Sequence, residues 1–307
     1  MSLESLLQAL ADPAEQPPAS QLVHLSNMGP EQTSAFLDAW MEMELRKRRW
    51  LVDELIGLAE DNVEVNFDAV FLVALKDRDP DVRRDAIRGL WEHDGRDLID
   101  TFVGLLESDP DAAVRAEAAL ALGRFVLHGE FGKLRTAAVQ RVDDALHRVV
   151  SDEAEVSEVR ARALEAIGAR SEDWVSELIQ DAYDGADRRL RLSAVHAMGR
   201  SCDTAWLPAL LIELENDDAE MRFEAAAAAG EIGEEEATPH LLPLLHDEDA
   251  EVQGAAISAL GEIGGGAARE ALKELVQEGS ERTREAAEAA LAQLEFAEDP
   301  LGFTVRE

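Results

Sequence analysis

Apolar and polar positions alternate along this chain with the period of an α-helix. In the segment that begins at Val252, apolar residues follow at Ala256, Ala259 and Leu260, which places them on one helical face. No segment shows the period-two alternation that is typical of a strand. We therefore predict an all-α protein in which each such helix follows another short helix with apolar residues at three- and four-residue steps, for example at 98–106, 174–183, 206–214, 238–245 and 267–276.

An arginine recurs at a fixed place near the start of the second helix of each pair. It follows an apolar residue and precedes an alanine-rich stretch, and one copy carries glutamine instead. The successive spacings are 32, 45, 31, 31, 31 and 31 residues, which indicates a tandem repeat. The positions are Arg83, Arg115, Arg160, Arg191, Arg222, Gln253 and Arg284.

A glycine lies nine residues after the apolar landmark in most repeats. The first repeat has Trp91 at this place and the last has Ala292. A glycine here suits either a C-terminal helix cap or a close approach between neighbouring helices. The five glycines are Gly123, Gly168, Gly199, Gly230 and Gly261.

Helices of about ten residues are marginal alone, because nucleation costs more than so few backbone hydrogen bonds return. Stacking one helix pair on the next buries the remaining apolar surface. We therefore expect an array of about seven repeats over residues 66–294. The 45-residue spacing adds about 14 residues near 125–139, which form either an edge loop near a binding surface or longer helices with a bend.

The two ends of the chain depart from the repeat. Residues 1–20 carry three prolines and are expected to be a flexible segment. Residues 21–65 are expected to form a divergent helical cap, with breaks at Met28-Gly29-Pro30 and near Leu45. Residues 295–307 are expected to be a C-terminal tail, either flexible or a short peptide ligand for a partner.

The net charge of −36, from 65 acidic and 29 basic residues, narrows the range of partners. Such a surface repels nucleic acids and anionic membranes, so we expect neither. The charge fits a basic protein partner or a salty or hot habitat. A monomer is the favoured oligomeric state. No run is apolar enough to span a membrane, and the first residues lack a secretory leader pattern, so we expect a cytoplasmic protein.

One repeat carries Asp109-Pro110-Asp111, then Val114-Arg115, then the run from Ala118 to Gly123. This motif resembles a HEAT repeat of the short bacterial type, which is also found in phycobilisome lyase proteins, and the resemblance covers residues 66–294. It implies an α-solenoid, a right-handed superhelix of helix pairs. It also implies a structural ladder between turn aspartates and helix arginines of adjacent repeats: Asp81, Asp111, Asp187, Asp218 and Asp249 with Arg83, Arg115, Arg160, Arg191 and Arg222.

No constellation of residues predicts catalysis, so we expect no enzyme and no metal or cofactor. The seven histidines show no zinc or di-iron spacing, and the single cysteine, Cys202, excludes an internal disulfide. The basic run from Arg46 to Arg49, followed by Trp50, fits a contact to phosphate or an acidic partner. It also fits a solvated helix face or an intramolecular clasp on the acidic array.

The second helix of each pair lines the concave face in HEAT arrays, so exposed positions on these helices are the candidate binding residues. Trp91 could act there as an aromatic anchor or pack beneath the N-terminal cap. We expect an interaction scaffold that binds a protein on this face; the alternative is a phycobilin lyase-like, chromophore-handling protein. The candidates are Arg84, Arg88, Trp91, Glu92, Arg124, His196, Arg200, Phe223, Glu224 and Glu231, with Glu117, Glu165, Ser193, Ser258 and Glu262 at equivalent positions.

Overall fold

The computed structural model describes residues 2–93 and 95–298, and in these residues it consists of helices and connecting turns without any strand. The predicted all-α solenoid class is confirmed. The chain divides into two compact units, Met1–Phe125 and Val126–Glu307. Each is described below by itself.

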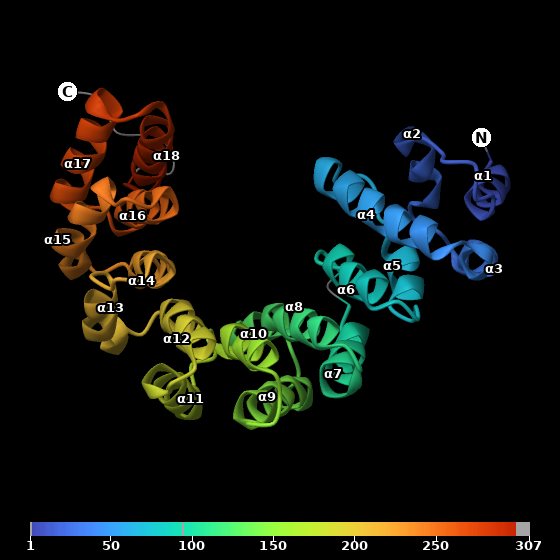
Figure 1. Ribbon diagram of the computed structural model, residues 1–307, viewed down its shortest axis with the longest axis horizontal. Helices are drawn as coiled ribbons and strands as arrows, with labels where there is room; N and C mark the ends of the chain where they lie inside the picture. Colours follow the sequence, from blue (N-terminus) through green and yellow to red (C-terminus); the bar gives the residue numbers. More distant parts are fainter. Residues whose placement is uncertain (1, 94, 299–307) are drawn as a thin grey trace. The chain divides into compact units, whose positions relative to one another are not determined.

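The first unit contains seven helices and most of an eighth (Figure 1). Helix α3 begins at Pro30 and α4 at Leu45, which are the two breaks expected from the sequence. Successive helices pack in two layers, because α3 contacts α5 and α4 contacts α6. The helices are α1 (Leu3–Ala11), α2 (Ala19–Leu22), α3 (Pro30–Glu42), α4 (Leu45–Asp61), α5 (Asp68–Ala74), α6 (Pro80–Gly89), α7 (Asp97–Ser108) and α8 (Ala112–Glu130), with the 3₁₀-helix η1 (Val23–Leu25).

The second unit is a regular stack of five helix pairs. The first helix of each pair forms one layer and the second helix forms the other (Figure 1). The first helices are α9 (Thr136–Ser151), α11 (Asp173–Asp184), α13 (Leu207–Glu213), α15 (Thr238–Leu241) and α17 (Gly265–Glu278). The second helices are α10 (Ser157–Ile167), α12 (Arg188–Ser201), α14 (Ala219–Ile232), α16 (Ala250–Ile263) and α18 (Glu281–Glu298), and the 3₁₀-helices are η2 (Thr204–Trp206), η3 (Glu235–Ala237) and η4 (Leu242–His246).

One expected first helix, at 238–245, is split into α15 and η4. Pro243 lies in the first turn of η4. Proline has no N–H to donate to the carbonyl four residues earlier, so the α-helical pattern cannot continue through it. The chain keeps its direction with the tighter 3₁₀ pattern instead.

The repeated glycines allow a close approach between second helices. An added Cβ at Gly199 would lie 2.6 Å from Cα of Ala228, and one at Gly168 would lie 2.8 Å from Cβ of Ala197. Gly199 lies within α12 and its φ is not positive, so a left-handed cap does not explain it. The close approach between neighbouring helices, and not a C-terminal helix cap, therefore explains the glycine at these positions.

The predicted ladder exists in part, but its carboxylates are different from the expected ones. Arg83 donates to both carboxylate oxygens of Asp109 at 2.7 Å, and Arg222 donates to both of Asp247 at 2.8 Å. These aspartates lie two residues before the expected Asp111 and Asp249.

The expected aspartates are occupied elsewhere. The side chains of four accept hydrogen bonds from backbone N–H groups in the first turn of their own helices, as N-caps do, and the fifth pairs with arginines. The four are Asp111, Asp187, Asp218 and Asp249, and the fifth is Asp81, which pairs with Arg49 and Arg84.

The other ladder arginines bind their own turns or a different acid. Arg115 donates to the carbonyl of Asp109 and Arg160 to the carbonyl of Val150. Arg191 reaches the buried carboxylate of Glu213 at 3.3 Å. In the repeat that follows Arg191, the turn residue equivalent to Asp109 and Asp247 is Asn216, which carries no charge. The side chain of Asn216 donates a hydrogen bond to Glu213.

The N-terminal segment that we expected to be flexible contains an ordered helix. Leu6 and Leu10 in α1 are fully buried, and α1 packs against α3. Lys47 is itself buried, and its ammonium group donates to the carbonyls of Asp12 and Glu15 just after α1. Apolar burial and this lysine hold the segment despite its prolines.

The basic run is an intramolecular clasp. Lys47 donates to the carbonyls that follow α1, Arg48 donates to Asp77 at 2.5 Å, and Arg49 donates to Asp79 through two nitrogens. Three of its four basic side chains are therefore used inside the first unit, which disfavours a phosphate site here.

The extra residues near 125–139 lengthen helices and add a short connection. Helix α8 continues to Glu130 and α9 begins at Thr136. At the other end, residues 295–298 continue α18 and are therefore not part of the expected tail. Residues 299–307 lie outside the described residues.

Candidate functional site

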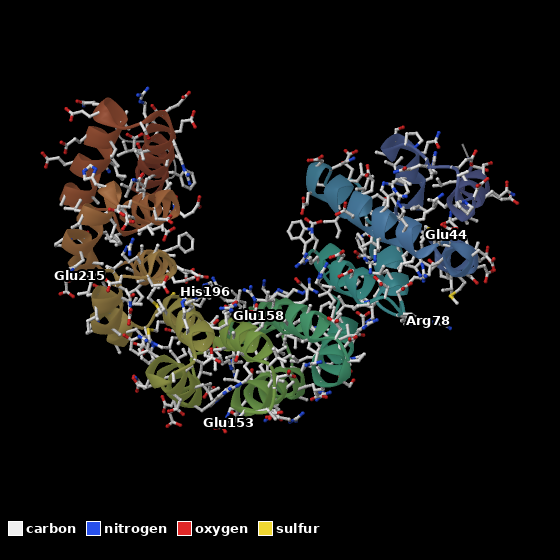
Figure 2. All side chains as sticks on the ribbon, viewed as in Figure 1. Glu44, Arg78, Glu153, Glu158, His196 and Glu215 are labelled. Atoms are coloured by element: carbon white, nitrogen blue, oxygen red, sulfur yellow. The ribbon has the colours of Figure 1, made fainter. Side chains whose placement is uncertain are left out.

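The second helices of the second unit expose a face that is turned away from the first helices, and we call it the inner face. Figure 2 shows Glu158 and His196 on this face, whereas Glu153 and Glu215 lie on the opposite side. The inner face combines side chains from α10, α12, α14 and α16, because these helices pack directly against one another.

An ion-pair network covers the inner face between α10 and α12. Arg189 donates to Glu158 at 2.6 Å, to Glu165 at 3.0 Å and to the hydroxyl of Ser193 at 2.7 Å. The Ser193 hydroxyl donates to Glu165 at 2.6 Å, and Arg162 donates to both glutamates. Hydrogen bonding by Arg189 lowers the pKa of Glu158.

Glu165 remains ionised although it is shielded from water. Burial opposes its charge, but the hydrogen bond from Ser193 and the nearby Arg162 outweigh burial, so the pKa of Glu165 is lowered. The charges in this part of the inner face neutralise one another. A partner that bound here through charge would first have to break these pairs.

Two pairs between α12 and α14 on the inner face are weaker than this network. The Nδ1 atom of His196 lies 3.2 Å from Glu224, and this hydrogen bond raises the pKa of His196. Arg200 lies 3.9 Å from Glu231, which is beyond hydrogen-bond distance.

Between α14 and α16 the inner face opens into a groove of about 290 Å³. Phe223 and Glu262 form part of its wall. Partial desolvation raises the pKa of Glu262, and the like charge of Glu231 raises it further. The groove is lined by Phe223, Ala227, Glu251, Gly254, Ala255, Ser258, Ala259 and Glu262.

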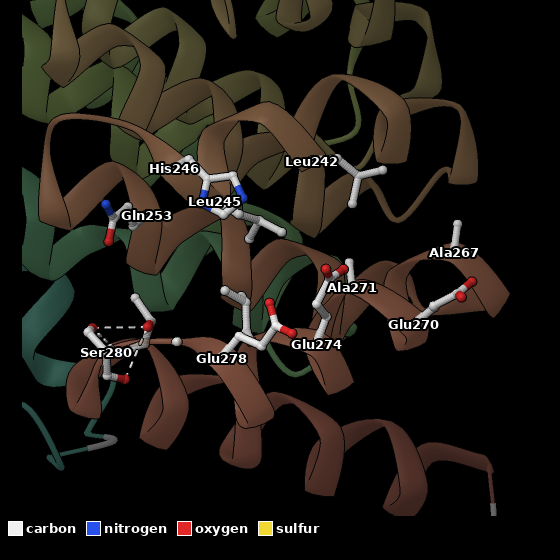
Figure 3. Close-up of a pocket in the computed structure, with 13 residues that line it drawn as sticks. Leu242, Leu245, His246, Gln253, Ala267, Glu270, Ala271, Glu274, Glu278 and Ser280 are labelled. Carbon is white, nitrogen blue, oxygen red and sulfur yellow. Dashed lines mark hydrogen bonds between the residues drawn. The ribbon is translucent and has the colours of Figure 1, made fainter.

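The first helices of the second unit form the layer opposite the inner face, which we call the outer layer. A second groove, of about 670 Å³, lies in this layer between η4 and α17 (Figure 3). Leu242 and Leu245 contribute apolar surface from η4. Opposite them, glutamates project from successive turns of α17, and none has a hydrogen bond or ion pair among the described residues. These are Glu270, Glu274 and Glu278.

The two candidate arginines of α6 pair with nearby carboxylates. Arg84 binds Asp81 and Asp85, and Arg88 donates to Glu117 at 2.9 Å. Glu92 is exposed in the turn that follows α6.

Arg124 and Trp91 meet at the end of α6. Arg124 donates to the carbonyls of Leu90 and Trp91 and lies over the rings of Phe102 and Phe125, so it has a structural role. The Trp91 side chain is 55% exposed, so it does not pack beneath the N-terminal cap.

The comparisons with known proteins place this fold in a family. The sequence profile of HEAT repeats matches residues 68–157 and 207–292, which together exceed half of the chain. This chain is a HEAT-repeat protein. No curated protein matches its sequence.

Solved structures show the same HEAT-repeat fold at low sequence identity. A chain of the CpcE–CpcF complex of phycocyanin lyase from Nostoc sp. PCC7120 matches with a TM-score of 0.53 and 19% identity, over 92% of this chain and 98% of that one. Kap95p, solved with RanGDP, matches with a TM-score of 0.51 and 15% identity, over 97% of this chain and 47% of that one. Identities this low establish the fold alone.

Sequence reasoning missed several residues of both grooves in this HEAT-repeat protein. Gly254 and Ala255 carry no chemical signal, and their importance lies in the space they leave beside Phe223. The glutamates of α17 recur every four residues, a spacing that could have indicated a common face. Among the described residues, no group of three or more potential ligand side chains is placed to hold a metal ion, and no helix is both long and apolar enough to cross a membrane.

Proposed function

We propose that this HEAT-repeat chain is a non-catalytic interaction scaffold that binds a basic segment of a protein partner on its inner face. The observation that carries the proposal is the groove between α14 and α16. It combines an aromatic wall, a floor of glycine and alanine, and the carboxylate of Glu262, which has no ion pair among the described residues, whereas the other lining carboxylate, Glu251, pairs with Arg282.

The charges support a basic partner. Glu262 receives only a 3.3 Å hydrogen bond from Ser258, and its pKa is raised, so ionised Glu262 lacks sufficient compensation within the chain. A lysine or arginine from a partner would supply the missing charge beside Glu231 and Glu262. The net charge of −36 would also accelerate the encounter with such a partner.

The apolar part of the groove supports binding of an apolar side chain from the partner. Phe223 is half-buried, and Gly254 and Ala255 opposite it leave space that larger residues would fill. Aromatic residues in such settings supply much of the binding energy at protein interfaces. The partner segment is therefore expected to place an apolar side chain next to a basic one.

The test measures binding of a labelled peptide with alternating Lys-Leu character, and capture of host proteins, by the full chain. We expect Phe223→Ala and the double change Glu231→Gln/Glu262→Gln each to weaken peptide binding by roughly tenfold or more, about 1.4 kcal/mol. Both should also remove the same host proteins from the captured set.

The matched control removes equal charge from the outer groove, with Glu274→Gln/Glu278→Gln. Trp91→Ala controls for an exposed aromatic in the first unit. If either control weakens peptide binding as much as the inner-face changes do, the inner face is not the binding surface. Equal binding by all variants would also refute the proposal.

A second candidate is a chromophore-handling protein related to phycobilin lyases. Its support is the fold that the chain shares with the CpcE–CpcF complex over nearly the full length of both chains. Co-expression with a phycobiliprotein and a bilin would distinguish the two functions. A coloured covalent adduct would favour the lyase; its absence, with peptide binding intact, would favour the scaffold.

A further inference from the structure

The first unit carries an apolar groove of about 740 Å³ between α3 and α5, to which α4 adds Arg48. The residues that line it recur at helical spacing on both helices, so two apolar stripes face each other. Helix α3 contributes Pro30, Thr33, Leu37, Trp40 and Met41, and helix α5 contributes Ala69, Leu72 and Val73.

The rim of this groove is exposed and its floor is fixed. Met41 is 67% exposed and Leu37 is 44% exposed. The floor residue Trp40 is buried, and its indole N–H donates to Asp77 at 2.9 Å. A rigid floor with an unbranched methionine at the rim suits a surface that adapts to an inserted apolar side chain.

Two cations stand at one end of the groove without partners. Lys76 and Arg78 are exposed, and within the described chain neither side chain makes a hydrogen bond or ion pair. Asp77 lies between them but is already bound by Trp40 and by Arg48. Asp77 therefore does not compensate the two cations.

The lack of ion pairs at Lys76 and Arg78 is unusual for this protein, because carboxylates are in large excess and many of its arginines form ion pairs with them. Arg83, Arg189 and Arg222 each bind carboxylates through two nitrogens. The outer groove of the second unit has the opposite charge, since unpaired glutamates line it. The general acidity of the surface thus does not account for Lys76 and Arg78.

We propose that the α3–α5 groove docks an amphipathic helix of a partner protein that presents apolar side chains followed by aspartate or glutamate. The apolar stripe from Pro30 to Met41 covers roughly 16 Å at 1.5 Å per residue, which matches about three turns of a helix. Apolar side chains of the helix fill the space above Trp40, and its carboxylates pair with Lys76 and Arg78. This helix differs in charge and in place from the basic segment proposed for the inner face.

The experiment uses the full chain and three labelled peptides of equal length. The first is an acidic amphipathic helix, the second is the same helix with lysine in place of the acidic residues, and the third has the composition of the first in scrambled order. Fluorescence anisotropy measures their affinities. We expect the acidic helix to bind at least tenfold more tightly than either of the others.

The variants locate the binding. Lys76→Glu/Arg78→Glu should weaken the acidic helix at least tenfold and improve binding of the lysine helix. Leu37→Ala, which leaves the buried floor unchanged, should weaken both helices. Arg46→Glu is the control, because it reverses the charge of an exposed arginine of the first unit that does not line the groove.

Three outcomes would overturn the proposal: no binding of the acidic helix, equal weakening by Arg46→Glu, or equal affinity for the scrambled peptide. Tighter binding to vesicles of anionic lipid than to the acidic helix would also overturn it, in favour of a lipid surface. The inner-face variants Phe223→Ala and Glu231→Gln/Glu262→Gln should leave the acidic helix unaffected, so failure here is distinguishable from failure of the proposed function.

Discussion

Replacing Gly199 by alanine tests the packing that defines the second unit. A Cβ at this position would lie 2.6 Å from Cα of Ala228 and 2.8 Å from its Cβ, whereas an ordinary contact begins near 3.4 Å. The obstacle is the backbone of α14, which cannot rotate away as a flexible side chain can. Helices α12 and α14 would therefore have to separate by about 0.8 Å.

Two effects of opposite sign decide the outcome. Alanine is favoured over glycine within a helix by up to about 1 kcal/mol. A separation approaching 1 Å forfeits a quarter to a half of the attraction between atoms in contact, and overpacking of a core typically costs about 1–3 kcal/mol. Since the contact between α12 and α14 extends over both helices, we expect the loss to exceed the gain and the free energy of unfolding to fall by about 1–2 kcal/mol.

Urea denaturation followed by far-ultraviolet circular dichroism measures the change. Gly254→Ala is the matched control, because Gly254 also lies within a second helix but an added Cβ would have no atom of another helix within 4 Å. This control should gain stability by up to about 1 kcal/mol. If Gly199→Ala is as stable as the natural chain, the close approach of α12 and α14 does not limit packing and the explanation of the repeated glycines is wrong.

Three further predictions concern buried or paired polar groups of the second unit. Arg222→Lys should reduce the free energy of unfolding by about 1–3 kcal/mol, measured in urea, because lysine cannot make the two parallel hydrogen bonds to the next turn. Burial and hydrogen bonding to Glu213 raise the pKa of Tyr183, the single tyrosine, to about 12; ultraviolet titration of the tyrosine should show this value, and Glu213→Gln should move the pKa towards 10.0. His196 has a raised pKa because it bonds to Glu224, so its stabilising contribution is complete below pH 6.5 and disappears as pH rises through the folded-state pKa. The difference in melting temperature between the natural chain and His196→Gln should therefore shrink as pH rises, and a difference that grows would contradict this.

The repeat was predictable because it rests on local signals. The spacing of 31 residues, the apolar period and the capping aspartates all act within one helix or one turn, so they can be recognised without knowing what packs against what. Asp187 and Asp218 do cap the helices that follow them. The class of fold followed from these signals.

The interactions between repeats were less predictable. The sequence offers two aspartates in the turn before Val114, and only the packed structure shows that Asp109 faces Arg83 while Asp111 is used by its own helix. The same limit applies to the N-terminal segment. Its prolines suggested flexibility, but α1 is held by the packing of Leu6 and Leu10 against α3 and by Lys47, more than thirty residues away.

The grooves of the outer layer could not be predicted because they are a consequence of packing in the other layer. Gly168, Gly199 and Gly230 bring each second helix close to the next, and the second helices pack directly on one another through the second unit. First helices carry larger side chains, such as Leu242 and Leu275, and successive first helices there make few direct contacts. Because the second helices lie close together and the first helices lie farther apart, grooves open between successive first helices, as between η4 and α17. Gly199→Ala should therefore do more than lower stability: by separating α12 from α14, it should reduce the difference in spacing between the two layers that opens grooves of this kind.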